Sequence, residues 1–330
     1  MKRLDEYWYH HNMVSILLFP LSLVFLTIVK IRHFLYRIGI LKSIKTERPI
    51  IVIGNINVGG TGKTPLVIWL VNFFKKQGFK PGIISRGYGG NSVYWPRIVN
   101  ADSDPETIGD EPMILFNRCQ CPVVVGPDRI ADIAELINLK QCDVILSDDG
   151  LQHYRMARDI EISVIDGKRR FGNQLCLPAG PLREPVSRLK TVDFLVTNGE
   201  AKNNEFKMEV IAKIVVQLNN NNINKKLDDF KGLTVHAVAG IGNPDRFFNL
   251  LKKHQLTIIK HVYPDHHQFK PVDIEFSDDF PVIMTEKDAV KCQKFSAEYH
   301  WYLSVEANIE IAFEEQLTQQ IKEKQWIKNY

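Results

Sequence analysis

The most constraining feature of this chain is a glycine-rich segment, GNINVGGTGKTP, at residues 54–65. It directly follows an apolar run at residues 50–53 and precedes an apolar, helix-compatible segment at residues 66–74. A buried strand, a glycine-rich turn and a helix start, in that order, are what a phosphate-binding loop requires. The glycines let the backbone approach a polyphosphate, and the N–H groups at the helix start supply positive potential there. The segment therefore predicts a nucleoside triphosphate site.

Within this loop, Lys63 is expected to reach the β- and γ-phosphates of ATP, and Thr64 to offer its hydroxyl to Mg²⁺. The predicted nucleotide-binding residues are Asn57, Val58, Gly59, Gly60, Thr61, Gly62, Lys63 and Thr64. Asn57 stands where the usual G-x-x-x-x-G-K-T pattern has its first glycine. Asparagine tolerates the left-handed backbone conformation better than most residues, so we expect the loop to form. A plain glycine-rich turn is the alternative, which the flanking strand and helix disfavour.

The composition limits the class of protein. A chain of 330 residues is long enough for two domains. The net charge of +4 does not by itself indicate nucleic-acid binding, and no protein partner is implied. The five cysteines are scattered, without zinc-site spacing, which favours reduced cytosolic thiols.

The N-terminal region contains an apolar run at residues 13–29, with Pro20 inside it. The run is at the short end of what spans a bilayer, and a basic stretch follows it without a cleavage site. The basic excess on that side predicts that the body of the protein stays in the cytoplasm. Residues 1–45 are therefore interpreted as a membrane-associated helix, spanning or lying in one leaflet, with Tyr7, Trp8 and Tyr9 as interfacial anchors. A buried core helix is the alternative.

After the loop, strands and helices alternate. The expected strands are residues 82–85, 122–125, 143–146, 160–165 and 194–197, and the expected helices are residues 111–118 and 129–138. This rhythm predicts a mostly parallel α/β sheet with helices on both faces, like that of P-loop NTPases, over residues 46–200. Residues 201–330 are expected to form a smaller α/β domain that closes over the active site, with strands at 233–239 and 281–284 and helices at 244–254 and 308–323.

Several polar residues follow predicted strands or precede predicted helices. Asp148 and Asp149 end an apolar strand, where nucleotide kinases hold Mg²⁺; a polar strand-exit turn is the alternative. Asp110 precedes a helix and is interpreted equally well as a helix cap or as a base that deprotonates an attacking hydroxyl. His266 lies in a turn after a strand. By itself the segment is typical of a plain surface turn, and no cysteine or third histidine lies near enough for a metal site; in a cleft facing an acid, His266 would support such a base. Arginines on several loops suggest an anionic substrate.

The ordered set of motifs resembles the tetraacyldisaccharide 4′-kinases (lipid A 4′-kinases) of Gram-negative bacteria. The motifs that carry the resemblance are the loop at residues 54–65, SRGYG at 85–89, GDEP at 109–112, DDGLQH at 148–153, LPAGPLRE at 177–184, AGIGNP at 239–244, PDH at 264–266 and TEKDA at 285–289. They run in order over most of the chain, which makes the set highly specific. Gln174 departs from the family's Gly-Asn-Gly pattern, so no role is carried over to it.

The resemblance implies that ATP phosphorylates the 4′-hydroxyl of an acylated disaccharide 1-phosphate, a lipid A precursor, with Mg²⁺ as the cofactor. The location implied is the cytoplasmic face of the bacterial inner membrane. The resemblance also implies roles for residues: Lys63 and Thr64 at the phosphates and metal, Asp148 and Asp149 near the metal, and Asp110 as the base paired with His266. The implied binders of the phosphorylated sugar headgroup are Arg86, Tyr88, Arg129, His153 and Arg183.

Two other functions fit the loop. The first is a membrane-associated NTPase switch or regulator without a lipid substrate. The second is a cytosolic small-molecule kinase or ATP-dependent ligase whose apolar N-terminus belongs to the core. Transfer of labelled γ-phosphate to a lipid disaccharide distinguishes both from the lipid kinase.

Overall fold

The computed structural model describes residues 7–10, 12–324 and 326 of the chain. The chain divides into two compact units. The first, which we call the phosphate-loop unit, comprises Met1–Arg86, Cys121–Val210 and Ala307–Tyr330. The second, which we call the Asp110 unit, comprises Gly87–Gln120 and Ile211–Glu306.

This division differs from the expected contiguous segments 46–200 and 201–330. Residues 87–120 belong to the Asp110 unit, and residues 307–330 belong to the phosphate-loop unit. The last helix, α8 (Ile311–Glu323), was expected in the C-terminal domain. Its Phe313 instead packs against Trp69, Phe194 and Phe206 of the phosphate-loop unit, with ring centroids 5.3–5.6 Å apart. An apolar helix face does not itself specify which sheet it covers, so the sequence left this open.

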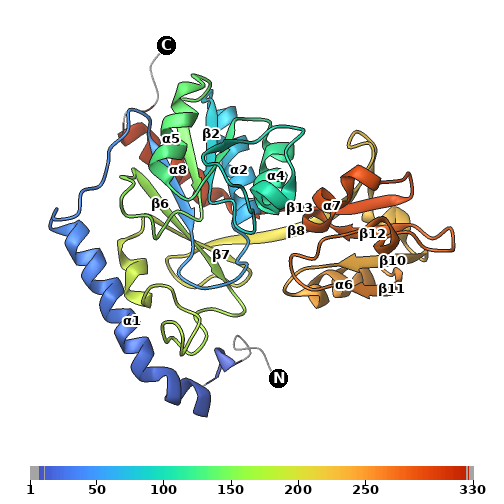
Figure 1. Cartoon of the computed structure of the whole chain (residues 1–330), viewed down its shortest axis with the longest axis horizontal. Coiled ribbons are helices and arrows are strands. Elements are labelled where there is room, and N and C mark those ends of the chain that lie inside the picture. Colours follow the sequence, from blue (N-terminus) through green and yellow to red (C-terminus); the bar gives the residue numbers. More distant parts are fainter. Residues whose placement is uncertain (1–6, 11, 325, 327–330) are drawn as a thin grey trace. The chain divides into compact units, whose positions relative to one another are not determined.

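The phosphate-loop unit is built on a parallel sheet in the strand order β8-β7-β6-β1-β5-β2-β4. Figure 1 labels β2, β6, β7 and β8 of these strands. Its strands are β1 (Ile50–Gly54), β2 (Pro81–Ser85), β4 (Val123–Val125), β5 (Val144–Asp148), β6 (Ile160–Asp166), β7 (Phe194–Asn198) and the start of β8 (Phe206–Gln217). All five strands expected in this region are confirmed. Every residue of β1, β2 and β5 is buried, which means that both faces of the sheet are covered.

Two helices cover the centre of this sheet. The α2 helix (Lys63–Lys76) follows the phosphate loop and contacts β1, β2 and β5. The α5 helix (Arg129–Asn138) packs Ile133 and Leu136 against the face that carries Ile50 and Val52. The expected α/β class, with a mostly parallel sheet and helices on both faces, is thus confirmed.

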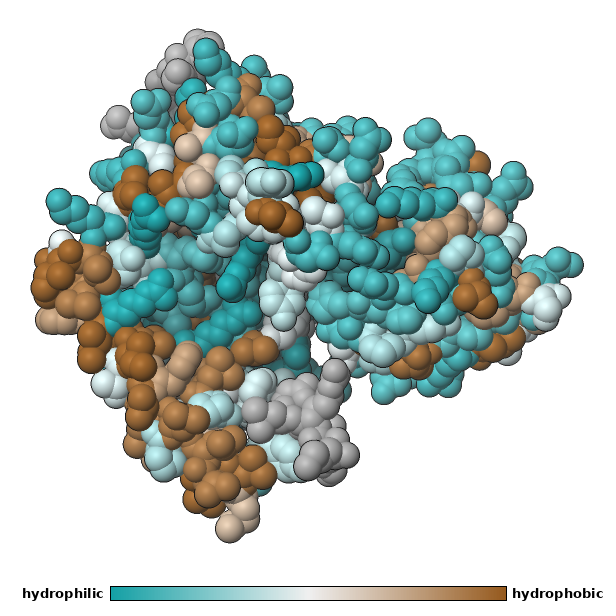
Figure 2. Space-filling view, viewed as in Figure 1, coloured by the Kyte–Doolittle hydropathy of each residue, from teal (hydrophilic) through white to brown (hydrophobic). Residues whose placement is uncertain are grey.

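The N-terminal helix α1 (Met13–Arg37) is long and apolar enough to cross a membrane, with a mean hydropathy of 2.4 over its most apolar window. Only 11% of that window is buried, so α1 is not a core helix. Figure 2 shows the apolar side chains of α1 gathered on the surface. One side of α1 docks on the protein, where the Ser22 hydroxyl donates to the Cys176 carbonyl (2.7 Å) and Phe25 and Leu26 pack on the core.

The aromatic residues before α1 are also attached to the protein. The Trp8 indole N–H donates to the Pro178 carbonyl (3.0 Å), and the Trp8 carbonyl accepts from the Asn173 N–H (2.8 Å). The position of Trp8 is therefore set by contacts within the phosphate-loop unit.

The strands of the Asp110 unit are hydrogen-bonded in the order β11-β10-β12-β13-β8, with β9 paired antiparallel to β8. Its strands are β9 (Asn224–Lys226), β10 (Thr234–Ala239), β11 (Thr257–Val262), β12 (Val282–Thr285) and β13 (His300–Ile309), together with the short β3 (Arg97–Ile98). Its helices are α3 (Pro105–Ile108), α4 (Asp110–Cys119), α6 (Pro244–Lys253) and α7 (Glu286–Cys292). Single turns of 3₁₀ helix occur at Leu227–Phe230, Pro271–Asp273 and Gln293–Phe295, and a longer one at Val186–Thr191 of the other unit.

Candidate functional site

The phosphate loop joins the end of β1 to the start of α2. Gly59 (φ 99°) and Gly62 (φ 101°) adopt backbone conformations that residues with a side chain rarely reach. A Cβ on Gly62 would also lie 2.9 Å from the Asn198 amide nitrogen. Both the backbone conformation and the limited space therefore favour glycine at this position. The Thr61 hydroxyl is buried, without a hydrogen-bond partner among the described residues. These features fit a loop whose polar groups are directed to a phosphate ligand.

The phosphate loop accommodates Asn57 through a side-chain contact and not through the left-handed backbone conformation that we expected. It is not among the described residues with a positive φ. Its side chain is buried, and its amide nitrogen donates to the Arg170 carbonyl (2.6 Å). The next residue, Val58, donates its N–H to the Pro181 carbonyl (2.8 Å). Asn57 thus fastens the front of the loop to neighbouring segments, a role that glycine could not fill.

Lys63 lies between two oxygen acceptors. Its ammonium is 3.2 Å from the Asn55 amide oxygen and 3.3 Å from Asp149 Oδ1. Arg183 contacts the second oxygen of the same carboxylate, with 3.0 Å between its guanidinium and Asp149 Oδ2. The structure therefore brings together three of the predicted site residues from three separate motifs: Lys63, Asp149 and Arg183.

The two aspartates at the end of β5 have different surroundings. Burial favours the neutral form of Asp149, but Lys63 and Arg183 outweigh it and lower the pKa of Asp149 to about 2. Asp149 is ionised at neutral pH and adopts the left-handed conformation (φ 51°). Asp148 is buried, and its carboxylate accepts a hydrogen bond from the Ser85 hydroxyl (3.2 Å).

The residues predicted to hold Mg²⁺ have the right chemistry. Thr64 lies in the first turn of α2, and Asp148 and Asp149 end the neighbouring strand β5. A hydroxyl and carboxylates are hard oxygen donors, which Mg²⁺ prefers and usually combines with substrate phosphates and water. No ready-made cluster of three or more His, Cys, Asp or Glu ligands occurs among the described residues. The donor set thus fits a metal that binds together with a nucleotide.

The other predicted headgroup residues of this unit are Arg86, Arg129 and His153. Arg86 follows β2 and is exposed. Arg129 is buried and donates to the carbonyls of Gly126 (2.9 Å) and Asp148 (3.1 Å). Its contacts with the end of β5 show that it shapes the site from within. Burial, followed by the charges of Arg129 and Arg86, lowers the pKa of His153 to about 4, so its imidazole is neutral at pH 7.

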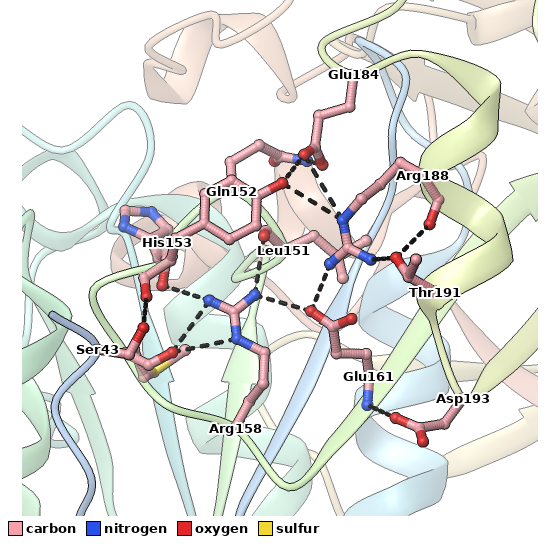
Figure 3. A network of polar contacts seen from close by, with 12 residues as sticks. Ser43, Leu151, Gln152, His153, Arg158, Glu161, Glu184, Arg188, Thr191 and Asp193 are labelled. Atoms are coloured by element: carbon pink, nitrogen blue, oxygen red, sulfur yellow. Dashed lines mark hydrogen bonds and ion pairs between the residues drawn. The ribbon is translucent and has the colours of Figure 1, made fainter. Parts of the chain in front are cut away.

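A polar network fixes the loop that carries His153 (Figure 3). The Gln152 amide donates to the Asn55 carbonyl of the phosphate loop (3.1 Å) and to Glu184 (2.8 Å). Glu184 also accepts from the Tyr154 hydroxyl. Sequence reasoning assigned no role to Gln152 or Glu184, although both lie within motifs that carry the resemblance.

The base of the same network is a buried ion pair. Arg158 bridges Glu161 of β6 (2.9 Å) and the Leu151 carbonyl (3.0 Å), and Arg188 also pairs with Glu161. The loop after β5 is thereby tied to β6 and to the 3₁₀ segment that contains Arg188.

Arg169 is a site residue that sequence reasoning missed. Its guanidinium donates to the Gly60 carbonyl of the phosphate loop and pairs with Asp166 (2.8 Å) at the end of β6. The sequence contains a signal for this site, because polar residues follow the strand that was expected at residues 160–165. The rule that ligands gather at the carboxyl ends of parallel strands points to Asp166 and Arg169.

The Asp110 unit holds the proposed acid–base pair. Asp110 is the first residue of α4 and is buried, and its Oδ2 lies 3.4 Å from Nδ1 of the half-exposed His266. The Tyr88 ring lies 5.7 Å from the His266 ring. Segments far apart in sequence thus bring the three predicted residues together, and Asp110 and His266 lie within reach of a shared proton.

Known proteins resemble this chain in sequence. The sequence profile of the tetraacyldisaccharide-1-P 4′-kinase family matches residues 14–322. A tetraacyldisaccharide 4′-kinase from Nitrosococcus oceani is 49% identical over 93% of this chain and 91% of its own length. One from Hahella chejuensis is 45% identical over 97% and 96%.

The fold agrees with these sequence matches. The crystal structure of LpxK from Aquifex aeolicus in complex with ATP superposes with a TM-score of 0.81 at 29% identity, covering 94% of this chain and 99% of that one. With a family match over nearly the whole chain and relatives at this identity, the protein belongs to the tetraacyldisaccharide 4′-kinase family.

Proposed function

We propose that this protein transfers the γ-phosphate of ATP to the 4′-hydroxyl of a tetraacyldisaccharide 1-phosphate, which forms the 4′-phosphorylated lipid A precursor. The observation that carries the proposal is the Lys63–Asp149 pair at the end of β5, beside a glycine loop that leads into α2. This is a phosphate-binding arrangement in a chain whose relatives are named for this kinase activity.

In the proposed reaction, the phosphate-loop unit binds and orients ATP. The loop N–H groups and Lys63 contact the phosphates, and Arg183 adds a second cation beside Asp149. Thr64, Asp148 and Asp149 would hold Mg²⁺, which would supply positive charge to neutralise the phosphates. Phosphoryl transfer depends mainly on such positioning and charge neutralisation, because the protein performs little covalent chemistry in it.

The Asp110 unit supplies the base. Asp110 accepts the proton of the 4′-hydroxyl, and His266 orients its carboxylate and shares the charge that develops. The proposal assigns Asp110 and Lys63 to one reaction. Arg86, Tyr88, Arg183 and His153 contact the phosphorylated sugar headgroup, whereas Arg129, predicted to do the same, is buried and supports the end of β5 instead. Because its imidazole is neutral, His153 acts there through hydrogen bonds rather than through charge.

The acyl chains explain the apolar N-terminus. The exposed face of α1 lies in the cytoplasmic leaflet of the inner membrane, where the headgroup of the lipid substrate meets water. The basic residues that follow α1 favour the same side of the membrane.

The test is transfer of labelled γ-phosphate from ATP to a detergent-solubilised tetraacyldisaccharide 1-phosphate by the purified full-length chain. The expected result is label on the lipid at the 4′-position, dependent on Mg²⁺. Nucleotide hydrolysis without labelled lipid would instead indicate an NTPase switch. Labelling of a non-acylated sugar at an equal rate would indicate a small-molecule kinase.

A further inference from the structure

Two lysines of α7 contact the first turn of α4 in the Asp110 unit. Lys287 Nζ lies 2.9 Å from Glu111 Oε1, and Lys291 Nζ lies 3.4 Å from Asp110 Oδ2. The lysines are four residues apart and therefore lie on one face of α7. Glu111 and Asp110, adjacent in α4, are thus paired with Lys287 and Lys291, which lie one turn apart in α7. Only the Lys291 contact involves the proposed base.

Lys291 is itself held in place. Its side chain is 9% exposed, and its ammonium lies 3.5 Å from Asp288 Oδ1 as well as beside Asp110. Asp288 is fixed in turn, because its Oδ2 accepts from the Gly240 N–H (3.0 Å) and the Thr285 hydroxyl (2.6 Å). A buried ammonium requires such partners, and here both of them are carboxylates. Lys291 is therefore a fixed point charge.

The two groups that contact Asp110 meet the same oxygen. His266 Nδ1 and Lys291 Nζ are each 3.4 Å from Oδ2, from two different segments of the unit. Two contacts from different segments on one oxygen restrict the rotation of the carboxylate about its Cβ–Cγ bond. A carboxylate held in this way is oriented to accept the proton of an attacking hydroxyl.

We propose that Lys291 is a positioning residue for the kinase reaction, one that acts by holding the Asp110 carboxylate in a fixed orientation. The inference rests on the proposed function of Asp110 as the base. In this arrangement His266 shares the charge that develops on Asp110, whereas Lys291 sets the direction of the carboxylate. Lysine is suited to this task because its compact ammonium contacts Asp110 and Asp288 at once.

The experiment compares Lys291→Met with Lys287→Met, a matched removal of a lysine one turn away. Lys291→Met is expected to lower kcat for lipid phosphorylation by about 30-fold or more, with the KM for ATP within about 2-fold of wild type. Lys291→Arg keeps the charge and should recover kcat to within about 5-fold of wild type. Lys287→Met should stay within about 3-fold, because Lys287 pairs with Glu111 and not with the proposed base.

A double variant separates positioning from general support of the fold. If Lys291 acts through Asp110, adding Lys291→Met to Asp110→Ala should change the remaining single-turnover rate by less than about 2-fold. An equal loss in both backgrounds would show that Lys291 acts independently of Asp110, and the inference would be wrong.

Other outcomes separate this inference from the proposed function. A wild-type kcat in Lys291→Met, with Asp110→Ala inactive, overturns the inference alone. No lipid labelling by wild type, or full turnover by Asp110→Ala, overturns the proposed function. If Lys291→Met melts below the assay temperature, Lys291→Gln replaces it, with the same expected loss and the same criteria.

Discussion

Lys63 of the phosphate loop and Asp149 at the end of β5 form an ion pair, with 3.3 Å between Nζ and Oδ1. Arg183 holds the other carboxylate oxygen at 3.0 Å. Since these two cations lower the pKa of Asp149 to about 2, the carboxylate stays charged throughout the physiological range. Lys63 is thus oriented by contacts within the protein as well as by any phosphate that it meets.

Asp149→Asn keeps the size of the side chain but removes its charge. We expect kcat for lipid phosphorylation to fall by about 100-fold or more, because both the orientation of Lys63 and an oxygen ligand for Mg²⁺ are weakened. Steady-state kinetics with labelled ATP measure the change. Asp128→Asn is the control, since asparagine also caps a helix well and should preserve the α5 N-terminus. Equal activity of the two variants would contradict the role of Asp149.

Asp110→Ala removes the proposed base. The expected loss in kcat is about 10²- to 10⁴-fold, with a smaller loss for His266→Ala, since histidine acts through the carboxylate. ATP affinity, measured by calorimetry, should remain near the wild-type value in both variants because the phosphate-loop unit keeps all its own contacts. Turnover close to normal in both variants would remove the proposed pair from the mechanism.

Arg169→Ala removes the donor that holds the Gly60 carbonyl. The phosphate loop loses one of its braces, so we expect the Kd for ATP to rise by about 10-fold while kcat changes less. The exposed Arg155 of the same unit pairs with Asp128, and Arg155→Ala serves as a control for the loss of one positive charge. A similar shift in both variants would mean that charge alone, rather than the contact with the loop, determines affinity.

The stability of the protein should depend on pH through His153. Its pKa is about 4 in the folded protein, against an ordinary value of 6.5, chiefly because of burial. Between these values the unfolded chain binds a proton that the folded chain does not, so stability falls as the pH is lowered from 6.5 towards 4. Urea unfolding at pH 6.5, 5.5 and 4.5 should show His153→Gln losing less stability than wild type, by up to about 1 kcal/mol per pH unit. Parallel curves for the two proteins would exclude the assigned pKa.

Membrane attachment is predicted to depend on the exposed face of α1. Leu17 and Ile28 are 80% and 59% exposed, so aspartate at these positions should leave the docked side of the helix intact. The double variant should lose most of its sedimentation with phosphatidylethanolamine–phosphatidylglycerol vesicles, because charge in the acyl region is costly. Val93→Asp, at an apolar position that is 85% exposed outside α1, is the control and should bind as wild type does. Unchanged binding by the α1 variant would assign attachment to another surface.

The elements of the fold were largely readable from the sequence. Apolar runs such as residues 50–53 and 123–125 became buried strands because a parallel sheet covered on both faces needs continuous apolar residues. The units into which the elements assemble were not readable. Residues 87–120 and α8 each pack with segments that are distant in the sequence. Such long-range packing leaves no periodic signal in the sequence.

The site was predictable wherever a motif carried its own chemistry. Lys63, Asp149, Asp110 and His266 lie in such motifs. The structure places His266 beside Asp110, as the resemblance implies, and it adds an ion pair between Lys63 and Asp149 that was not expected. Residues that act through main-chain contacts were less visible. Asn57 was interpreted through its backbone preference, whereas the structure shows a side-chain hydrogen bond to Arg170, a residue that lies 113 positions away.

The return of α8 to the phosphate-loop unit has a consequence for how the protein is made. On a ribosome, apolar α1 emerges before any strand, whereas Phe313, which completes the aromatic cluster around Trp69, emerges near the end. The phosphate-loop unit therefore cannot finish folding until α8 has been synthesised. The apolar helix α1 is synthesised well before the phosphate-loop unit is complete, so the membrane attachment proposed for α1 can precede the acquisition of activity.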